Sequence, residues 1–296
     1  MSDLWWVLAL FSGVLMAGMI YANQIFKMPS SLMMTYRGVV QGLILLPFIP
    51  FFAIPSNPLF WLFVIIQGLM VAYNDKKTFL CSRKYGGEIT ASIKPYSVVM
   101  TFVFWLIIRP TQLLQMIDTP IRSVGIMACI IASAYSLRLI NKSKISKEAF
   151  FELLPALLLS VLIDANNKIT TTYGASTDLI SAIFYYCMMT AFFSGLPNVI
   201  SFVRKNDWRE IFGRKYIIGG LVVIFFSITS NIFKNSAMYY AENPAYVGAV
   251  IAMYPIWIII WNIFYYKFRK SEQYPRCNFV GIGILLASVI LLILLQ

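Results

Sequence analysis

Eight charged residues lie deep within long apolar stretches of this sequence, where charged side chains are uncommon. The basic ones are Arg37, Lys76, Lys77, Lys94, Lys168 and Lys234, and the acidic ones are Asp75 and Asp164. At the centre of a bilayer, each would cost about 2.5–3.5 kcal/mol on insertion scales unless it found a partner or water. Such charges mark a functional cavity by default, and the excess of basic groups favours an anionic or zwitterionic ligand.

Helical spacing gathers several of these charges on polar faces, because residues three and four positions apart lie on the same side of a helix. The first face contains Met70, Tyr73, Asn74, Lys77 and Cys81; the second contains Ser160, Asp164, Asn167, Lys168 and Thr171; the third contains Ser227, Asn231, Lys234, Asn235 and Met238. Three polar faces on apolar helices predict one central cavity. We expect Lys77 and Lys234 to face each other across it, where an anionic ligand would relieve their repulsion.

Some of these charged residues could form ion pairs with one another instead of binding a ligand. Arg37 and Lys94 join the candidate cavity residues. Asp164 and Lys168 are four residues apart and could neutralise each other. Asp75 lies on another side of its helix from Lys77, so it needs a different partner, such as Arg37 or Lys94. If transport is coupled to protons, Asp75 or Asp164 must carry them, because the sequence contains no histidine.

Two prolines interrupt apolar stretches at similar depth. Pro95 and Pro255 would leave the carbonyls of Ala91 and Ile251 without their usual helical donors. We interpret these prolines as gating elements, because a kinked helix lets a cavity open on one side and close on the other. The alternative is a kink that only aids packing.

Motifs for catalysis and for cofactor binding are missing from the sequence. There is no histidine, no glycine-rich phosphate loop of the P-loop type and no Cys/His cluster, and the four cysteines have no close spacing. ATP hydrolysis, zinc chemistry and Ser-His-Asp catalysis therefore lack their side chains. We expect no enzyme activity, no cofactor and no metal.

Composition places these residues in a membrane protein. Of 296 residues, 59% are hydrophobic and only 12% are charged, which excludes a soluble domain and disorder. Ten apolar stretches are long enough to cross a bilayer. They are Trp5–Phe26, Leu32–Ala53, Leu59–Cys81, Ile89–Ile108, Ile121–Ile140, Phe150–Thr171, Leu179–Val203, Tyr216–Tyr239, Ala245–Tyr266 and Phe279–Leu295. The sequence thus predicts an all-α integral membrane protein with ten transmembrane helices. The first stretch has no basic region before it, so we expect an uncleaved helix.

Basic residues outside these spans are distributed unevenly. The first, third, fifth, seventh and ninth connections together hold sixteen Lys and Arg residues, whereas the other side holds only Arg109 and Arg122. Basic loops stay in the cytoplasm. We therefore expect the odd-numbered connections to be cytoplasmic and both termini to lie outside, in the cell (inner) membrane. This bias orients the chain, so most of the net charge of +12 needs no nucleic acid to explain it.

Weak internal similarity divides the chain into a first repeat, 1–144, and a second repeat, 145–296. Each repeat contains five spans. Matching pairs are Asn23 with Asn166, Tyr36 with Tyr186, Asn74 with Asn231, Lys77 with Lys234, Pro95 with Pro255, and Gly125 with Gly281. Because five is odd, the second repeat must be inverted in the membrane relative to the first. This 5+5 inverted repeat is typical of secondary transporters, whose site lies near the midplane where the halves meet.

These features resemble the drug/metabolite transporter superfamily, of EamA type. The resemblance rests on the 5+5 arrangement, on Tyr36-Arg37-Gly38, on Asn243-Pro244-Ala245-Tyr246 followed by Met253-Tyr254-Pro255, and on Val280-Gly281-Ile282-Gly283. It covers nearly the whole chain and implies a ten-helix carrier, but it does not specify the substrate. Lys94, directly before Pro95, departs from the pattern and suggests unusual cargo.

The sequence favours a secondary carrier or exchanger that moves a small organic metabolite by alternating access through a basic cavity. The alternatives are a flippase for a lipid or lipid-linked headgroup, then a channel or an embedded enzyme. The expected surroundings are a small-molecule substrate and the lipid bilayer, without nucleic acid. We expect a monomer or homodimer.

Overall fold

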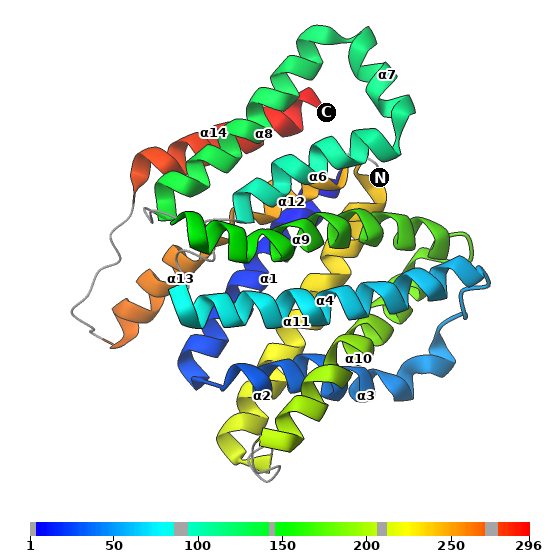
Figure 1. Cartoon of the computed structure of the whole chain (residues 1–296), viewed down its shortest axis with the longest axis vertical. Coiled ribbons are helices and arrows are strands. Elements are labelled where there is room, and N and C mark those ends of the chain that lie inside the picture. Colours follow the sequence, from blue (N-terminus) through cyan, green and yellow to red (C-terminus); the bar gives the residue numbers. More distant parts are fainter. Residues whose placement is uncertain (1–3, 86–93, 142–145, 206–211, 270–277) are drawn as a thin grey trace.

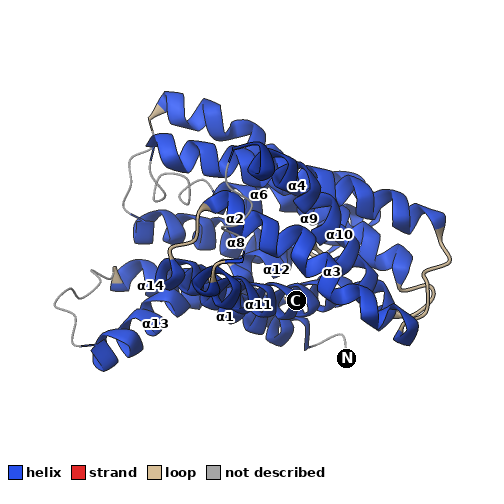
Figure 2. Cartoon of the chain, turned by 90° about the horizontal axis from the view of Figure 1, so that it is seen from below, coloured by secondary structure: helices blue, strands red, loops and turns tan. Residues whose placement is uncertain are grey.

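Long helices make up almost all of the structure, a computed structural model that describes residues 4–85, 94–141, 146–205, 212–269 and 278–296 (Figure 1). No strand occurs among these residues, as Figure 2 shows. The longer helices are α1 (Trp5–Phe26), α4 (Pro58–Tyr85), α6 (Lys94–Ile108), α8 (Pro120–Asn141), α9 (Lys147–Gly174), α10 (Leu179–Lys205), α11 (Arg214–Tyr240), α13 (Tyr254–Arg269) and α14 (Phe279–Leu295).

Several shorter helices complete the fold. They are α2 (Ser30–Thr35), the π-helix η2 (Tyr36–Val40), α3 (Gln41–Leu45), the 3₁₀-helix η3 (Leu46–Phe51), α7 (Pro110–Asp118) and α12 (Pro244–Ile251). The first four follow one another without a gap and fill most of the predicted span Leu32–Ala53. Pro47 and Pro50 explain the final 3₁₀ segment, because proline removes a backbone donor from the regular α-helical ladder.

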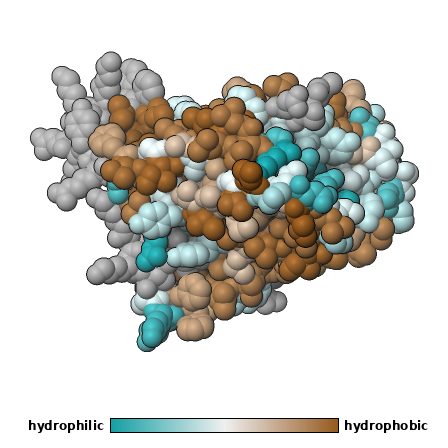
Figure 3. All heavy atoms as spheres, turned by 90° about the horizontal axis from the view of Figure 1, so that it is seen from above, coloured by the Kyte–Doolittle hydropathy of each residue, from teal (hydrophilic) through white to brown (hydrophobic). Residues whose placement is uncertain are grey.

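The described helices identify a multi-pass membrane protein. Seven of them are long and apolar enough to cross a bilayer, or eight if the bent pair Pro95–Ile108 and Pro110–Asp118 forms one span. Large apolar side chains point outward, including Ile121, which is 90% exposed. In Figure 3 such apolar side chains cover much of the visible face. The prediction of an all-helical membrane protein is therefore confirmed.

Two groups of helices form the walls of the molecule. In the first helix group, α1 packs along α11 and also contacts α12 and α13. In the second helix group, α9 packs along α4 and also contacts α6. Contacts between the groups are made by α11 and α12, which touch α9 and α6. Helices α8 and α14 pack together at one edge, and their ribbons run side by side in Figure 1.

Helix α10 crosses η2 with almost no space between the two backbones. A Cβ atom added to Gly38 would lie 2.3 Å from the Cα atom of Gly195, and one added to Gly195 would lie 2.3 Å from the Val39 nitrogen. Small residues permit such close approach within membranes. This crossing fixes Arg37, which is next to Gly38, relative to α10.

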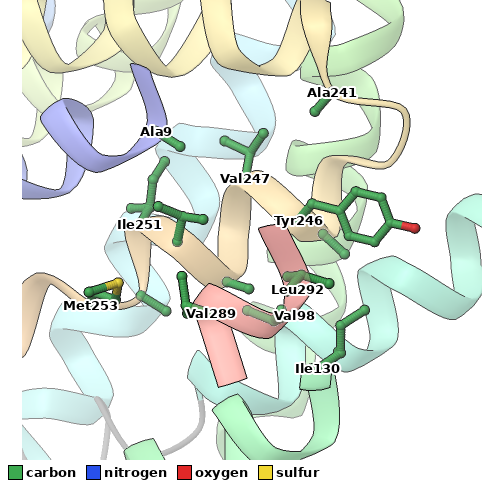
Figure 4. Close-up of a cluster of buried hydrophobic side chains, with 14 of the residues drawn as sticks. Ala9, Val98, Ile130, Ala241, Tyr246, Val247, Ile251, Met253, Val289 and Leu292 are labelled. Carbon is green, nitrogen blue, oxygen red and sulfur yellow. The ribbon is translucent and has the colours of Figure 1, made fainter. Parts of the chain in front are cut away.

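The largest buried apolar cluster surrounds α12. Val247 and Ile251 of α12 lie near Ala9, Val98 and Val289, as the close-up in Figure 4 shows. The helix ends at Ile251, and α13 begins three residues later. Apolar packing on many sides therefore holds the broken part of this span in place.

Candidate binding cavity

A polar cavity of about 230 Å³ lies between the two helix groups and is also bounded by α10, η2 and α3. Its wall includes serines, threonine, asparagines, glutamines and tyrosines in addition to four charged residues. The polar lining residues are Ser12, Arg37, Gln41, Gln67, Asn74, Asp75, Ser97, Ser160, Asp164, Asn167, Tyr186, Thr190, Ser194, Ser227, Ser230, Asn231, Lys234 and Tyr254. A wall so rich in polar groups suits water or a polar solute.

Charges in the described lining cancel, because two bases face two acids. Lys234 donates a hydrogen bond from Nζ to Oδ1 of Asp164 at 2.9 Å. This bond links α11 of the first helix group to α9 of the second. Arg37 lies 3.5 Å from Asp75, between its Nη1 atom and the carboxylate Oδ2 atom. The described lining is therefore formally neutral and not strongly basic.

Three amide oxygens of the lining have no hydrogen-bond partner. They are Oε1 of Gln41, Oδ1 of Asn74 and Oδ1 of Asn167, and all three are buried atoms. An unsatisfied buried acceptor costs about 1–3 kcal/mol. The Nδ2 atom of Asn74 does donate to Oγ of Ser160 at 3.3 Å, which ties α4 to α9. The cavity thus offers acceptors that water or a ligand with N–H or O–H groups would satisfy.

The predicted meeting of Lys77 and Lys234 across the cavity is wrong. Lys77 lies 3.9 Å from Oε1 of Glu152 and does not line the cavity. Glu152 also accepts hydrogen bonds from Lys84 at 2.7 Å and from the Tyr85 hydroxyl at 2.6 Å. Lys77 lies nearer the end of its helix than Asn74 does, so it reaches a carboxylate on α9 instead.

The cavity-facing side of α4 also differs from the predicted face. Gln67, Val71, Asn74 and Asp75 line the cavity, whereas Tyr73 is 55% exposed and points away from it. The predicted face was centred on Lys77. It was therefore rotated about the helix axis relative to the side of α4 that carries Gln67 and lines the cavity. Glu152 lies inside the predicted span Phe150–Thr171, but its spacing in the sequence does not show that it meets Lys77 of another helix.

Lys168 belongs to the predicted cavity face but does not line the cavity. Its Nζ atom donates to the backbone oxygen of Tyr239 at 2.6 Å. The alternative Asp164–Lys168 pair is therefore not the pairing found, since Asp164 binds Lys234. Asn235 is also outside the cavity lining, where its amide lies 3.6 Å from the Cys187 sulfur.

The structure also shows the partner of Asp75 and the positions of the two prolines. Asp75 pairs with Arg37, one of its two expected partners. Pro255 follows the break between α12 and α13, where Ile251, Ala252 and Tyr254 line the cavity. Pro95 is the second residue of α6. The side chain of Lys94 and the carbonyl of Ala91 lie outside the described residues.

Several lining residues escaped prediction from the sequence. Gln41 follows Arg37 by one helical turn, and Gln67 precedes Asn74 by two turns, so spacing alone could have identified both. Ser12 and Ser230 form mutual hydrogen bonds between α1 and α11, at 3.0 Å between their hydroxyls. Uncharged hydroxyls in apolar helices give a weak sequence signal, because they also serve simple packing.

Three bonds join the two helix groups in the second halves of α6, α9 and α11. Besides Lys234–Asp164 and Lys168–Tyr239, the indole nitrogen of Trp105 donates to the backbone oxygen of Glu242 at 3.0 Å. Each bond joins the first helix group, or the turn after α11, to the second helix group. The two groups are therefore fastened together on this side of the cavity.

Comparison with known proteins adds no assignment. No protein-family model and no curated protein matches the chain. Among the described residues, no group of three His, Cys, Asp or Glu side chains could hold a metal ion.

Proposed function

We propose that the protein is a secondary carrier that moves a small polar metabolite by alternating access through the central cavity. The observation that carries this proposal is the polar cavity between two helix groups that are bonded to each other across one side. A carrier needs a site whose two walls part on one side while they close on the other. Lys168–Tyr239 and Trp105–Glu242 would be the bonds that break when the closed side opens.

We further propose ten spans arranged as a 5+5 inverted repeat, 1–144 and 145–296. In support, most main contacts between helices have an equivalent contact when each helix is replaced by its counterpart in the other repeat. The α1–α11 contact corresponds to α9–α4, and contacts of α1 with α12 and α13 correspond to α9–α6. The α8–α14 contact corresponds to itself. Three pairs, Gly38/Gly195, Asn74/Asn231 and Lys77/Lys234, share the same separation of 157 residues.

Cavity size favours a small solute over a lipid-linked headgroup. Pockets for drug-sized ligands have volumes of about 300–1,000 Å³. The cavity of about 230 Å³ is smaller, with room for about eight waters at liquid density. A flippase would need space for a larger group, so we favour a metabolite.

Membership of the drug/metabolite transporter superfamily and a place in the cell (inner) membrane are part of the same proposal. The sequence motifs and the interchangeable contacts support the former, and the basic odd-numbered connections support a cytoplasmic position for those loops. On this orientation, the Lys168–Tyr239 and Trp105–Glu242 bonds lie at the non-cytoplasmic side. The cavity would then open toward the cytoplasm.

Uptake by proteoliposomes tests the carrier proposal even while the substrate is unidentified. Vesicles that contain the purified protein are exposed to an isotopically labelled polar metabolite extract, and their contents are measured by mass spectrometry. Protein-free vesicles serve as the control. We expect saturable entry of at least one small solute. Entry that never saturates would indicate a channel, and entry of none would contradict a carrier.

A further inference from the structure

The unpartnered amide oxygens of the cavity call for a ligand that donates hydrogen bonds. Asn167 is 2% exposed and Gln41 is 1% exposed, so solvent outside the protein does not satisfy their side-chain oxygens. Asn74 joins Ser160, which precedes Asp164 by one turn on α9, and Asn167 follows Asp164 by three residues. Asn74, Asp164 and Asn167 therefore form an acceptor group on adjacent parts of α4 and α9. A cationic group with N–H bonds matches it.

Arg37 supplies the opposite chemistry on another wall. Its guanidinium has five N–H donors, yet within the described residues it makes one ion pair, at 3.5 Å, and no hydrogen bond. That separation exceeds the 2.7–2.9 Å that is usual for a charge-assisted hydrogen bond. Arg37 can therefore bind a carboxylate of a ligand while Asp75 stays nearby. The donor, Arg37, lies on η2, whereas the acceptor group lies on α4 and α9.

Other ligand classes match only part of this wall. A simple anion would leave the amide oxygens unsatisfied, and a simple cation would leave the Arg37 donors unsatisfied. A quaternary ammonium has no N–H bond to give, and the described lining offers only Tyr186 and Tyr254 as aromatic rings. Recognition of quaternary ammonium groups uses aromatic cages. The balance of two acids and two bases favours a ligand without net charge.

From this wall we infer that the cavity binds a small zwitterion whose cationic group carries N–H bonds, with its carboxylate at Arg37 and its ammonium at the acceptor group of Asn74, Asp164 and Asn167. The inference rests on the proposed function, since it takes this cavity as the binding site. It also narrows the broader expectation of an anionic or zwitterionic ligand. Lys234 and Asp164 remain paired, so the ligand adds its own two charges to a neutral site.

Thermal shift of the purified full-length chain tests this inference, because a ligand of the folded state raises the melting temperature. The probes are the common α-amino acids, β-alanine and γ-aminobutyrate. Each probe that raises Tm is compared with its N-trimethylated form, its decarboxylated amine and its deaminated acid. We expect at least one zwitterion to raise Tm. Its three analogues should need at least tenfold higher concentrations for the same shift.

Two variants locate the binding. Asn167→Leu should raise the concentration for half-maximal shift about tenfold, because it removes an acceptor. Thr101→Val is the matched control, since Thr101 is also buried with an unpartnered hydroxyl but does not line the cavity. The inference is overturned if no zwitterion raises Tm, if a trimethylated form acts as well as its parent, or if Asn167→Leu has no effect.

The outcome separates this inference from the carrier proposal. A zwitterion that binds but is not taken up by proteoliposomes would leave the inference intact and remove the proposed function. Saturable uptake of only anions or only cations would leave the carrier proposal intact and remove this inference.

Discussion

Lys234 and Asp164 form the closest ion pair of the cavity and join its two walls. At 26% and 20% side-chain exposure, neither charge is fully solvated. Removal of one partner of a buried pair leaves an uncompensated charge, whereas replacement of both by apolar groups is often neutral or stabilising. Single substitutions in this pair should therefore destabilise the fold more than replacement of both residues.

We predict that Lys234→Met or Asp164→Leu alone lowers the free energy of unfolding by about 1–3 kcal/mol, less than for fully buried pairs because water reaches both groups. The double variant should recover most of the loss. Denaturation in detergent, arranged as a double-mutant cycle, measures this coupling. Equal and additive losses would show that the two charges do not interact.

Asp178 is the helix cap at the start of α10. Its Oδ2 atom accepts a hydrogen bond from the Ser181 backbone nitrogen at 2.8 Å. That bond lowers the pKa of Asp178 below its ordinary value of 3.8. A carboxyl group with a lowered folded-state pKa stabilises the fold above its unfolded pKa, and this contribution is lost as pH falls through the folded pKa.

We therefore predict that Asp178→Ala lowers the stability of the folded protein at pH 7 by about 0.5–1 kcal/mol, the lower part of the N-cap range, since the carboxylate is exposed. The difference between variant and wild type should shrink as the pH drops below about 4. Melting temperatures across this pH range provide the measurement. A difference that grew on acidification would refute the cap.

Sequence spacing identified Asp164, Asn167, Asn231 and Lys234 as neighbours, and the structure brings all four to one cavity. It failed for Lys77, because periodicity shows which side of a helix a residue occupies but not which helix it meets. Glu152 comes from another helix, so only the tertiary fold could reveal that pair.

Among the elements, the crossing of η2 and α10 positions Arg37. We predict that Gly195→Leu prevents folding, because even a Cβ there would collide with the backbone at Val39. Gly283→Leu is the matched control, since no atom lies within 4 Å of its added Cβ. The yield of monodisperse protein after purification compares them. Equal yields would mean that the two backbones cross less tightly than these distances imply.

The contact between α9 and α11 is the proposed closing contact. We predict that Lys168→Cys with Tyr239→Cys, joined by a bifunctional thiol reagent, abolishes uptake by proteoliposomes. Either single variant with the same reagent should retain uptake. The reason is that the joined helices could not separate, so the closed side would stay closed. Full uptake after complete cross-linking would contradict the gating role of this contact.

Element boundaries followed well from apolar length. Helix α1 occupies Trp5–Phe26, as predicted, and α14 occupies Phe279–Leu295, as predicted. The second span was predicted as one stretch and consists of four helical segments, because π and 3₁₀ turns depend on local packing as well as on proline. Helix α7 was not predicted, since its nine residues are too short for a span.

We propose that the net charge of +12 serves mainly to orient the chain in the membrane. We predict that cysteines introduced at Ser2 and Gln296 react with an impermeant reagent outside intact cells. A cysteine at Lys147, in a basic connection, should react only after lysis. If both cysteines at the ends of the chain were protected in intact cells, the proposed orientation would be wrong.

We propose that one cavity opens alternately to the two sides of the membrane. Ser227→Cys places a thiol in the cavity wall, in a protein whose native cysteines are replaced. Labelling with an impermeant reagent, applied separately to each side of vesicles, measures its access. We predict reaction from both sides, and reaction from only one side once positions 168 and 239 are cross-linked. A thiol that is reached from one side alone before cross-linking would contradict alternating access.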